Sequence, residues 1–325
     1  MTSPSIYRAY GITLESTYPF RFSLSRASGA PDVRIRVVDE SPRPDFWDGA
    51  RPVHIESQGE DGLADAIFLN DDIADIAVLR FASAADIYIG RETIACHLKK
   101  PHLTDALEVW LFGPVLAIWL ERRGVLALHA ASVSVDGAGI GMLATSQSGK
   151  STLAAAMMER GHPLLTDDIL AVTTSASGPV AQPGYPQMRL WSDQVQRWVG
   201  EADLPRVVPH LDKRRVPVGV DGFGTFQSDP VPLRALLIPE RGPDAQDVAF
   251  RRLSPTEAIM ECIRHSFLPQ SIHALGLSAQ RQEALATLVR TVPAYACIYP
   301  DGLDRVSEVV DAIEQQVRLL AQKAA

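Results

Sequence analysis

Residues 144–152 read Ala-Thr-Ser-Gln-Ser-Gly-Lys-Ser-Thr, with an apolar segment before them and an alanine-rich segment after them. The run fits the pattern GxxxxGK[ST], except that Ala144 replaces the first glycine. This pattern is typical of a loop that joins a strand to a helix and donates its backbone N–H groups to phosphate oxygens. A Gly/Ser-rich turn without a ligand is the alternative. The flanking segments favour the phosphate-binding loop, because they have the patterns of a buried strand and a helix.

The loop positions have separate chemical roles in this interpretation. Gly149 permits a close backbone approach where a Cβ would intrude, Lys150 can reach the β and γ phosphates, and Ser151 can place its hydroxyl on magnesium. The expected ligands are therefore a nucleoside triphosphate and Mg²⁺. The residues expected to bind them are Ser146, Gln147, Ser148, Gly149, Lys150, Ser151 and Thr152.

Two adjacent aspartates, Asp167 and Asp168, follow an apolar segment, and Asp167 lies only 17 residues after Lys150. An aspartate at the end of a strand near a phosphate loop commonly holds magnesium, directly or through water. Of two adjacent carboxylates, one can bind the metal while the other accepts a proton from an attacking hydroxyl. A solvated acidic turn is the alternative, and the short distance to the loop favours the functional interpretation.

The segments around the loop predict a mixture of strands and helices. Asp136-Gly137 is a tight-turn pair that joins two strands into a hairpin, and Gly161 is expected to end the helix after the loop. The aspartates are expected on the strand that follows this helix. Strands are predicted at 126–135, 139–144, 164–173, 187–191, 231–238 and 294–298, and helices at 104–123, 150–160, 255–264, 279–292 and 304–324.

The chain divides near Leu103 into two predicted domains. Residues 1–103 contain short apolar or alternating runs between proline and acidic clusters, which predicts a small β-rich domain. No cluster of catalytic residue types occurs there, so partner recognition is the role we expect. Residues 104–325 carry the loop and form an α/β domain.

Composition restricts the class of protein. With 46% hydrophobic and 22% charged residues, the chain has the balance of a soluble globular protein, and its net charge of -8 argues against nucleic-acid binding. The longest apolar run, 109–120, is 12 residues long, whereas a bilayer span needs ~20, and no secretory signal is visible. Three cysteines without a CxxC pair favour a reducing cytoplasm over a disulfide framework or a zinc site.

For a few other residues, the sequence is compatible with either a structural or a functional role. His129 lies in an apolar strand, where a hydrogen-bonded core histidine is the usual interpretation. Arg189 could point toward the nucleotide. The run 213–215, Lys-Arg-Arg, could clamp a phosphate or an acidic peptide tail, although a solvated loop is the simpler interpretation. The run 264–266, Arg-His-Ser, is expected to complement the charge at the end of a helix.

Three stretches resemble the HPr kinase/phosphorylase family and its relatives. The histidine-bearing segment 123–137, the loop segment 148–152 and the segment 160–168 with its paired aspartates are similar to that family's motifs. The resemblance covers 123–172 well, is vaguer toward the C-terminus and does not extend to the first hundred residues. It implies a mixed sheet around the phosphate loop, as in the nucleotide domain of phosphoenolpyruvate carboxykinase, and ATP-dependent phosphorylation of serine.

The resemblance also implies residue roles. Asp167 would be the general base, or the acid in the reverse direction, and Asp168 would help to hold magnesium together with Ser151. His129 would sit beside the aspartates and tune them, and Lys150 would act on the phosphates. The family's glycine-rich segment for docking HPr is not found, and neither is a later glutamate for the metal. Asp193 and Glu201 are the only candidates for that last position.

These observations predict an ATP- and magnesium-dependent kinase that phosphorylates a serine of a peptide or small protein. HPr itself is not the expected substrate, whereas kinases of this kind also act on ribosomally made precursors such as those of lasso peptides. A small-molecule kinase, or a nucleotide-gated switch with slow ATPase activity, are the alternatives. The sequence predicts no nucleic-acid or membrane partner and leaves open whether the chain forms a homo-oligomer.

Overall fold

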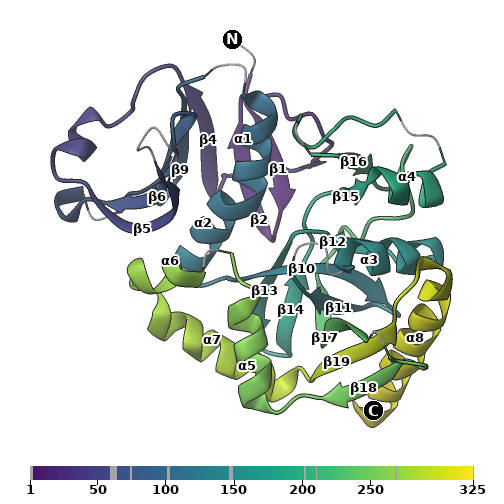
Figure 1. Cartoon of the computed structure of the whole chain (residues 1–325). Coiled ribbons are helices and arrows are strands. Elements are labelled where there is room, and N and C mark those ends of the chain that lie inside the picture. Colours follow the sequence, from purple (N-terminus) through teal and green to yellow (C-terminus); the bar gives the residue numbers. More distant parts are fainter. Residues whose placement is uncertain are drawn as a thin grey trace.

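The computed structural model describes residues 3–58, 64–73, 75–100, 103–145, 149–200, 203–209, 211–242, 244–267 and 269–324. Two large sheets dominate, one formed by the N-terminal third of the chain and the other by the rest (Figure 1). This confirms the predicted mixed α/β class. No helix in the described parts of the chain is long and apolar enough to cross a membrane.

The N-terminal sheet has nine strands within the described residues, in the order β3-β1-β2-β4-β9-β8-β7-β6-β5. Its strands are β1 (Ser5–Ala9), β2 (Ile12–Ser16), β3 (Ser25–Arg26), β4 (Val33–Val38), β5 (Arg51–Gln58), β6 (Ala64–Leu69), β7 (Ala77–Phe81), β8 (Ala85–Ile89) and β9 (Thr93–Leu98). Strand β4 runs parallel to both of its neighbours, and the remaining pairs are antiparallel. Short 3₁₀ turns, η1 (Pro44–Asp48) and η2 (Asp71–Ile73), connect some of them.

The apolar run at 109–120 forms a broken helix that covers this sheet. Helix α1 (Thr104–Trp110) continues through a π-helical turn, η3 (Leu111–Val115), into α2 (Leu116–Arg122). The break lies at Gly113-Pro114, because proline cannot donate the helical hydrogen bond. Leu111, Phe112 and Trp119 are buried in one cluster with residues of the N-terminal sheet, as predicted for a buried element. The predicted domain boundary near Leu103 therefore separates these helices from the sheet on which they pack, and it stays a prediction.

The second sheet contains the strands around the phosphate loop. Its strands are β10 (Leu126–Val135), β11 (Ala138–Leu143), β12 (Leu164–Thr166), β13 (Ile169–Ser175), β14 (Gly178–Gln182), β17 (Val231–Gly242), β18 (Ala249–Arg252) and β19 (Ala294–Pro300). The predicted hairpin is confirmed, since Asp136 and Gly137 both have positive φ, 49° and 74°, between β10 and β11. Strand β17 pairs with both β14 and β11, so β11, β10, β13, β14 and β17 close into a ring.

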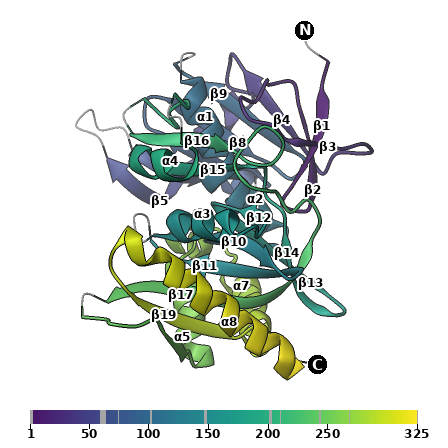
Figure 2. The same ribbon diagram turned by 90° about the vertical axis from the view of Figure 1, so that its right-hand side faces the viewer.

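Helices cover the second sheet on both sides (Figures 1 and 2). Helix α3 (Lys150–Glu159) packs against β10 and against α8 (Val306–Ala324), and the 3₁₀ turn η4 (Leu303–Arg305) precedes α8. On the other face, α5 (Pro255–Arg264) and α7 (Ser278–Thr291) share a core cluster with the strands, and α6 (Pro269–Ala274) lies between them in sequence. The predicted helices of this half are confirmed to within two residues at each end.

A separate two-stranded ribbon lies between the N-terminal sheet and α3 (Figure 2). It consists of β15 (Gln187–Trp191) and β16 (Lys213–Pro217), paired antiparallel, and α4 (Ser192–Trp198) follows β15 directly. One face of the ribbon packs into the core beneath α3 through Met188, Leu190 and Val216. The opposite face is thereby directed toward the site described next.

Candidate active site

The start of α3 carries the glycine and lysine of the loop pattern. Strand β11 ends at Leu143, and Gly149 caps α3 with a left-handed φ of +93°. Ser146, Gln147 and Ser148 lie outside the described residues, so their predicted contacts stay predictions. A Cβ on Gly149 would lie 3.1 Å from the Tyr299 hydroxyl and 3.4 Å from the Arg241 guanidinium. Both its φ and this crowding therefore call for glycine.

We expect Gly149→Ala to destabilise the fold by about 1–2 kcal/mol, the usual cost of a left-handed conformation for an L-residue. It should also weaken ATP binding, because the added methyl group displaces Tyr299 or Arg241 at the mouth of the loop. Gly161→Ala is the matched control, since Gly161 has a similar φ of +91° but open space around a Cβ. Equal ATP affinities of the two variants, measured by isothermal titration calorimetry, would contradict this account.

Lys150 is buried at the first position of α3 and holds the end of the loop. Its Nζ donates to the carbonyl oxygens of Ala144 at 2.5 Å and Thr145 at 3.2 Å, and lies 3.4 Å from Nε2 of His129. Burial lowers the pKa of this ammonium group, while the two nearby aspartates oppose the shift. The side chain is thus a rigidly placed cation that can exchange its carbonyl contacts for phosphate oxygens.

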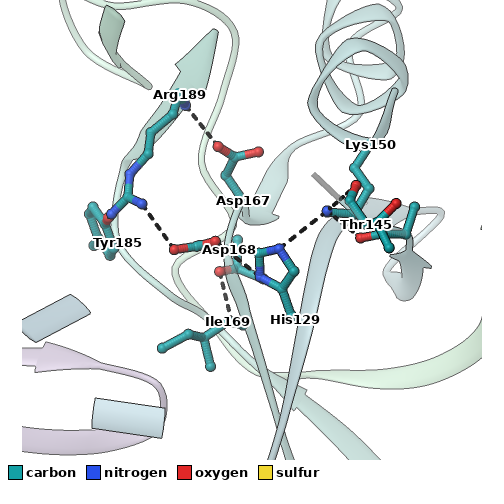
Figure 3. A network of polar contacts seen from close by, with 10 residues as sticks. His129, Thr145, Lys150, Asp167, Asp168, Ile169, Tyr185 and Arg189 are labelled. Carbon is teal, nitrogen blue, oxygen red and sulfur yellow. Dashed lines mark hydrogen bonds and ion pairs between the residues drawn. The ribbon is translucent and has the colours of Figure 1, made fainter. Parts of the chain in front are cut away.

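The two aspartates occupy a break between β12 and β13, whereas the sequence predicted one continuous strand at 164–173. That prediction was wrong at its centre: β12 and β13 both pair with β10 and share one register (Ser132↔Thr166 and His129↔Ile169), but Asp167 and Asp168 between them belong to neither strand. Figure 3 shows the Asp168 carboxylate directed toward the Arg189 guanidinium, while the Asp167 carboxylate lies at the Arg189 backbone N–H. His129, from β10, lies between Asp168 and Lys150.

Asp167 is a partly buried carboxylate whose two oxygens have different surroundings. Its Oδ2 accepts the backbone N–H of Arg189 at 2.7 Å. Its Oδ1 is buried and meets no donor at hydrogen-bonding geometry among the described residues. Burial raises the pKa of Asp167, against the lowering effects of Lys213, the Arg189 amide and Ser151. A carboxyl group with a raised pKa is better suited to accept and return a proton near neutral pH than an ordinary one.

Asp168 has the opposite electrostatic environment. Its Oδ2 accepts from the Arg189 guanidinium at 3.0 Å, and its Oδ1 lies 3.2 Å from Nδ1 of His129. Burial alone would raise the pKa of Asp168, but Arg189 and His129 outweigh it and hold this pKa well below its usual range. The adjacent carboxylates therefore differ in protonation behaviour, with Asp168 permanently ionised and Asp167 able to exchange a proton.

These groups line a cavity of about 450 Å³ at the start of α3. Ser151 and Thr152 line it as predicted, and Gln194 of α4 fixes Thr152 by donating to its hydroxyl at 2.7 Å. The cationic side chains of the wall are Lys150, Arg189, Lys213 and Arg241. A cavity whose walls carry this many cations around two carboxylates is electrostatically suited to a polyphosphate with a divalent cation.

Some predicted candidates lie elsewhere. Of the basic run, only Lys213 lines the cavity, because Arg214 pairs with Asp212 at 3.0 Å and Arg215 forms a buried ion pair with Glu108 of α1. Asp193 is exposed in the first turn of α4 and does not line the cavity. Glu201 lies outside the described residues. The described residues contain no group of three or more His, Cys, Asp or Glu side chains that could hold a metal ion.

Sequence reasoning missed several neighbours of His129. The carbonyl of His265 accepts the His129 backbone N–H at 2.9 Å, and the Phe267 ring meets the His129 ring edge-on with centroids 4.8 Å apart. The expectation that His265 complements the end of α5 with its charge is wrong. Burial, followed by the proximity of Lys150, lowers the pKa of His265 to about 4, so the ring is neutral at pH 7. Nothing in the local sequence signals this, because β10 and α5 meet only in the folded chain.

Comparison with known proteins points to one family. Over 194 residues, the chain is 28% identical to the HPr kinase/phosphorylase of Neisseria meningitidis (serogroup C), which covers 55% of this chain and 59% of that protein. The HPr kinase/phosphorylase of Neisseria gonorrhoeae matches over the same length with the same identity. The chain is similar in sequence to the HPr kinase/phosphorylases. No family model matches it. The HPr(Ser) kinase/phosphatase of Coxiella burnetii aligns with a TM-score of 0.32 and 13% identity, over 61% of this chain and 97% of that one.

The matched part of the chain spans 59% of the length of the Neisseria proteins. Its site residues fit a nucleotide with a magnesium ion. Mg²⁺ is generally held by one or two carboxylates together with phosphate oxygens and water, and it needs no cage made only of protein groups. Ser151 and Asp168 could supply the protein ligands, and Lys150 could contact the phosphates.

Proposed function

We propose that the chain is an ATP- and magnesium-dependent kinase that phosphorylates a serine hydroxyl of a peptide or small protein. The observation that carries this proposal is the pair of adjacent, partly buried carboxylates with opposite pKa shifts beside the lysine that begins α3. The sequence relation to HPr kinase/phosphorylase supports the same class of reaction. We further infer that the second sheet corresponds to a nucleotide domain of the phosphoenolpyruvate carboxykinase type.

In the proposed reaction, the serine oxygen attacks the γ-phosphorus as its O–H bond breaks, and ADP leaves. Asp167 accepts the hydroxyl proton on its spare oxygen. Asp168 stays ionised between Arg189 and His129, which fixes its orientation. Lys150 neutralises charge on the β and γ phosphates, and magnesium when bound adds charge neutralisation of the same kind. Positioning and electrostatic stabilisation should therefore provide most of the rate.

The substrate we propose is a peptide, and specifically the precursor of a ribosomally made peptide such as a lasso peptide. The three cysteines are buried and unpaired, which is consistent with the reducing cytoplasm that the sequence predicts.

The pH dependence of transfer should reflect Asp167. The carboxyl must be ionised to accept a proton, so the rate should fall as pH decreases through its raised pKa. We therefore expect the acid limb of kcat against pH to lie above ~3.9, the ordinary value of an aspartate. A limb at or below that value, measured at saturating ATP and magnesium, would assign the base to another group.

Measurement of ADP formation separates this proposal from its alternatives. A peptide kinase should form ADP at a rate that rises with the concentration of serine peptide and not with that of small hydroxyl compounds such as glycerol or free serine. A small-molecule kinase would give the reverse result. A nucleotide-gated switch would form ADP slowly and at the same rate with every acceptor.

A further inference from the structure

A cavity of about 610 Å³ lies where the N-terminal sheet meets the end of α2, and it shares no lining residue with the catalytic cavity. Three parts of the chain form its wall. Asp75 and Arg91 come from connections between strands of the N-terminal sheet, Arg122 and Arg123 from the end of α2, and Gln280 from α7. Its volume falls within the range of small-molecule sites, so the cavity can hold a small ligand.

The three arginines give this cavity a local excess of positive charge. Asp75 is the one carboxylate among its described lining residues, so three guanidinium groups face a single negative side chain. Two carboxylates next to these arginines in sequence are engaged elsewhere. Glu92 lies 3.9 Å from Arg34, and Glu121 forms its buried ion pair with α7. None of the three arginines forms an ion pair within the described part of the chain, although the chain has a net charge of -8.

Arg122 is a half-buried cation whose hydrogen bonds to other described residues are both to backbone carbonyl groups. Its Nη1 donates to the oxygen of Ile89 at 2.6 Å, and its Nη2 donates to that of Asp75 at 3.0 Å. Burial lowers the pKa of this guanidinium, and the charge of Asp75 opposes the shift. A partly desolvated cation without a counter-ion is unfavourable, and a bound anion would offset that cost.

Trp119 holds the other two arginines beside the same cavity. Its indole N–H donates to the carbonyl oxygen of Arg91 at 3.1 Å, which fixes the backbone of that connection. The Arg123 guanidinium lies 5.1 Å from the centre of the Trp119 ring, in a cation–π contact. Complementing the dipole at the end of α2 would account for Arg122 and Arg123, but it would not account for Arg91, which belongs to another element.

We propose that this cavity binds a small oxyanion with at least two negative charges, held between the guanidinium groups of Arg91, Arg122 and Arg123. Guanidinium groups present paired N–H donors that match the oxygens of phosphate and carboxylate groups. A phosphate ester and a dicarboxylate both carry this chemistry. The inference does not depend on the proposed kinase reaction, because the site lies outside the catalytic cavity.

Isothermal titration calorimetry of the full chain tests the inference, with pyrophosphate as the phosphate probe and citrate as the carboxylate probe. Because phosphates should also enter the catalytic cavity, Lys150→Met is titrated beside the wild type at the same ionic strength. Both chains should bind a probe at the arginine site. Tighter binding of pyrophosphate would support a phosphate ligand there, and tighter binding of citrate a dicarboxylate. No binding to Lys150→Met at probe concentrations up to about 10 mM would overturn the inference.

Two changes of opposite sign, made in the Lys150→Met chain, locate the binding. Arg91→Ser with Arg123→Ser should weaken it at least about tenfold, because two donors of charge-assisted hydrogen bonds are lost. Asp75→Asn should strengthen it about two- to fivefold, because the negative charge of the wall is removed. Arg122 is left in place, since its contacts with backbone carbonyl groups hold the wall together.

Arg290→Ser with Arg318→Ser is the matched control, because it removes the same charge from exposed positions on α7 and α8 outside the cavity. Equal weakening by this control would show that net charge attracts the anion, and it would overturn the inference. Circular dichroism melting checks that each variant folds, and the probe should raise the melting temperature of the control more than that of Arg91→Ser with Arg123→Ser. If the latter variant fails to fold, an unchanged affinity of Asp75→Asn would still contradict the site.

Discussion

Replacement of Asp167 by asparagine is expected to lower the rate of phosphoryl transfer by about 10²- to 10⁴-fold, the usual contribution of a general base. Asparagine keeps the shape of the side chain and can still accept the Arg189 backbone N–H, but it cannot take a proton from serine. ATP affinity should stay close to that of the wild type, because this carboxylate is not the group proposed to contact the phosphates. Single-turnover transfer and calorimetric ATP titration measure the two quantities separately.

Protein stability offers an independent check on the same variant. The pKa of Asp167 is raised in the fold, so the carboxyl contributes stability below its unfolded pKa, and this contribution is lost as pH rises through the folded pKa. At neutral pH the buried charge therefore costs stability, and Asp167→Asn should unfold at an equal or higher urea concentration. Asp193→Asn, on the exposed start of α4, is the matched control for both measurements. If Asp167→Asn transfers phosphate as fast as Asp193→Asn does, Asp167 is not the general base.

The second prediction with a large expected effect concerns the stability of the fold. It involves an ion pair that lies outside the catalytic cavity. Glu121 of α2 and Arg281 of α7 form an ion pair in which both side chains are 6% exposed. Glu121 also accepts the backbone N–H of Ala127, and Arg281 donates to the Ser266 hydroxyl at 2.6 Å. We expect Glu121→Gln to lower the free energy of unfolding by about 3–5 kcal/mol, because it leaves a buried guanidinium without a counter-charge.

Urea denaturation measures this effect, with Glu261→Gln as the control. Glu261 pairs with Arg264, whose side chain is 62% exposed, and solvent screening limits such a pair to about 1 kcal/mol or less. Because Ser266 bridges to Leu128, next to His129, the same variant should also disturb the catalytic strand. An unfolding energy within 1 kcal/mol of the wild type would show that the pair contributes little to the fold.

Local signals in the sequence predicted the elements that build the site. The turn at Asp136-Gly137 and the end of α3 at Gly161 follow from glycine and aspartate chemistry within a few residues. The start of α5 has a similar local cause, a capping box in which Ser254 and Glu257 bond each other's backbone N–H groups. Each of these features depends on residues that are close in sequence, so the sequence alone indicates it.

The features that the sequence did not predict depend on distant contacts. The break between β12 and β13 falls at Asp167 and Asp168, whose carboxylates both accept hydrogen bonds from Arg189 of the ribbon, while the residues from 164 to 173 read as one strand. Helices α1 and α2 pack on the N-terminal sheet although they adjoin the loop-bearing half in sequence. His265 and Phe267 come to His129 from the end of α5, and no spacing along the chain indicates that meeting.

The central claim is that this chain transfers phosphate to a serine of a peptide. Its most direct test is mass spectrometry of serine-containing precursor peptides, starting with those encoded nearby, after incubation with the full chain, ATP and magnesium. Asp167→Asn is incubated in parallel at the same protein concentration. We predict a phosphate-sized mass increase on a serine with the wild type and none with the variant over the same time. ADP formed without phosphorylated peptide, at a rate indifferent to the peptide, would contradict the claim and favour a nucleotide-gated switch.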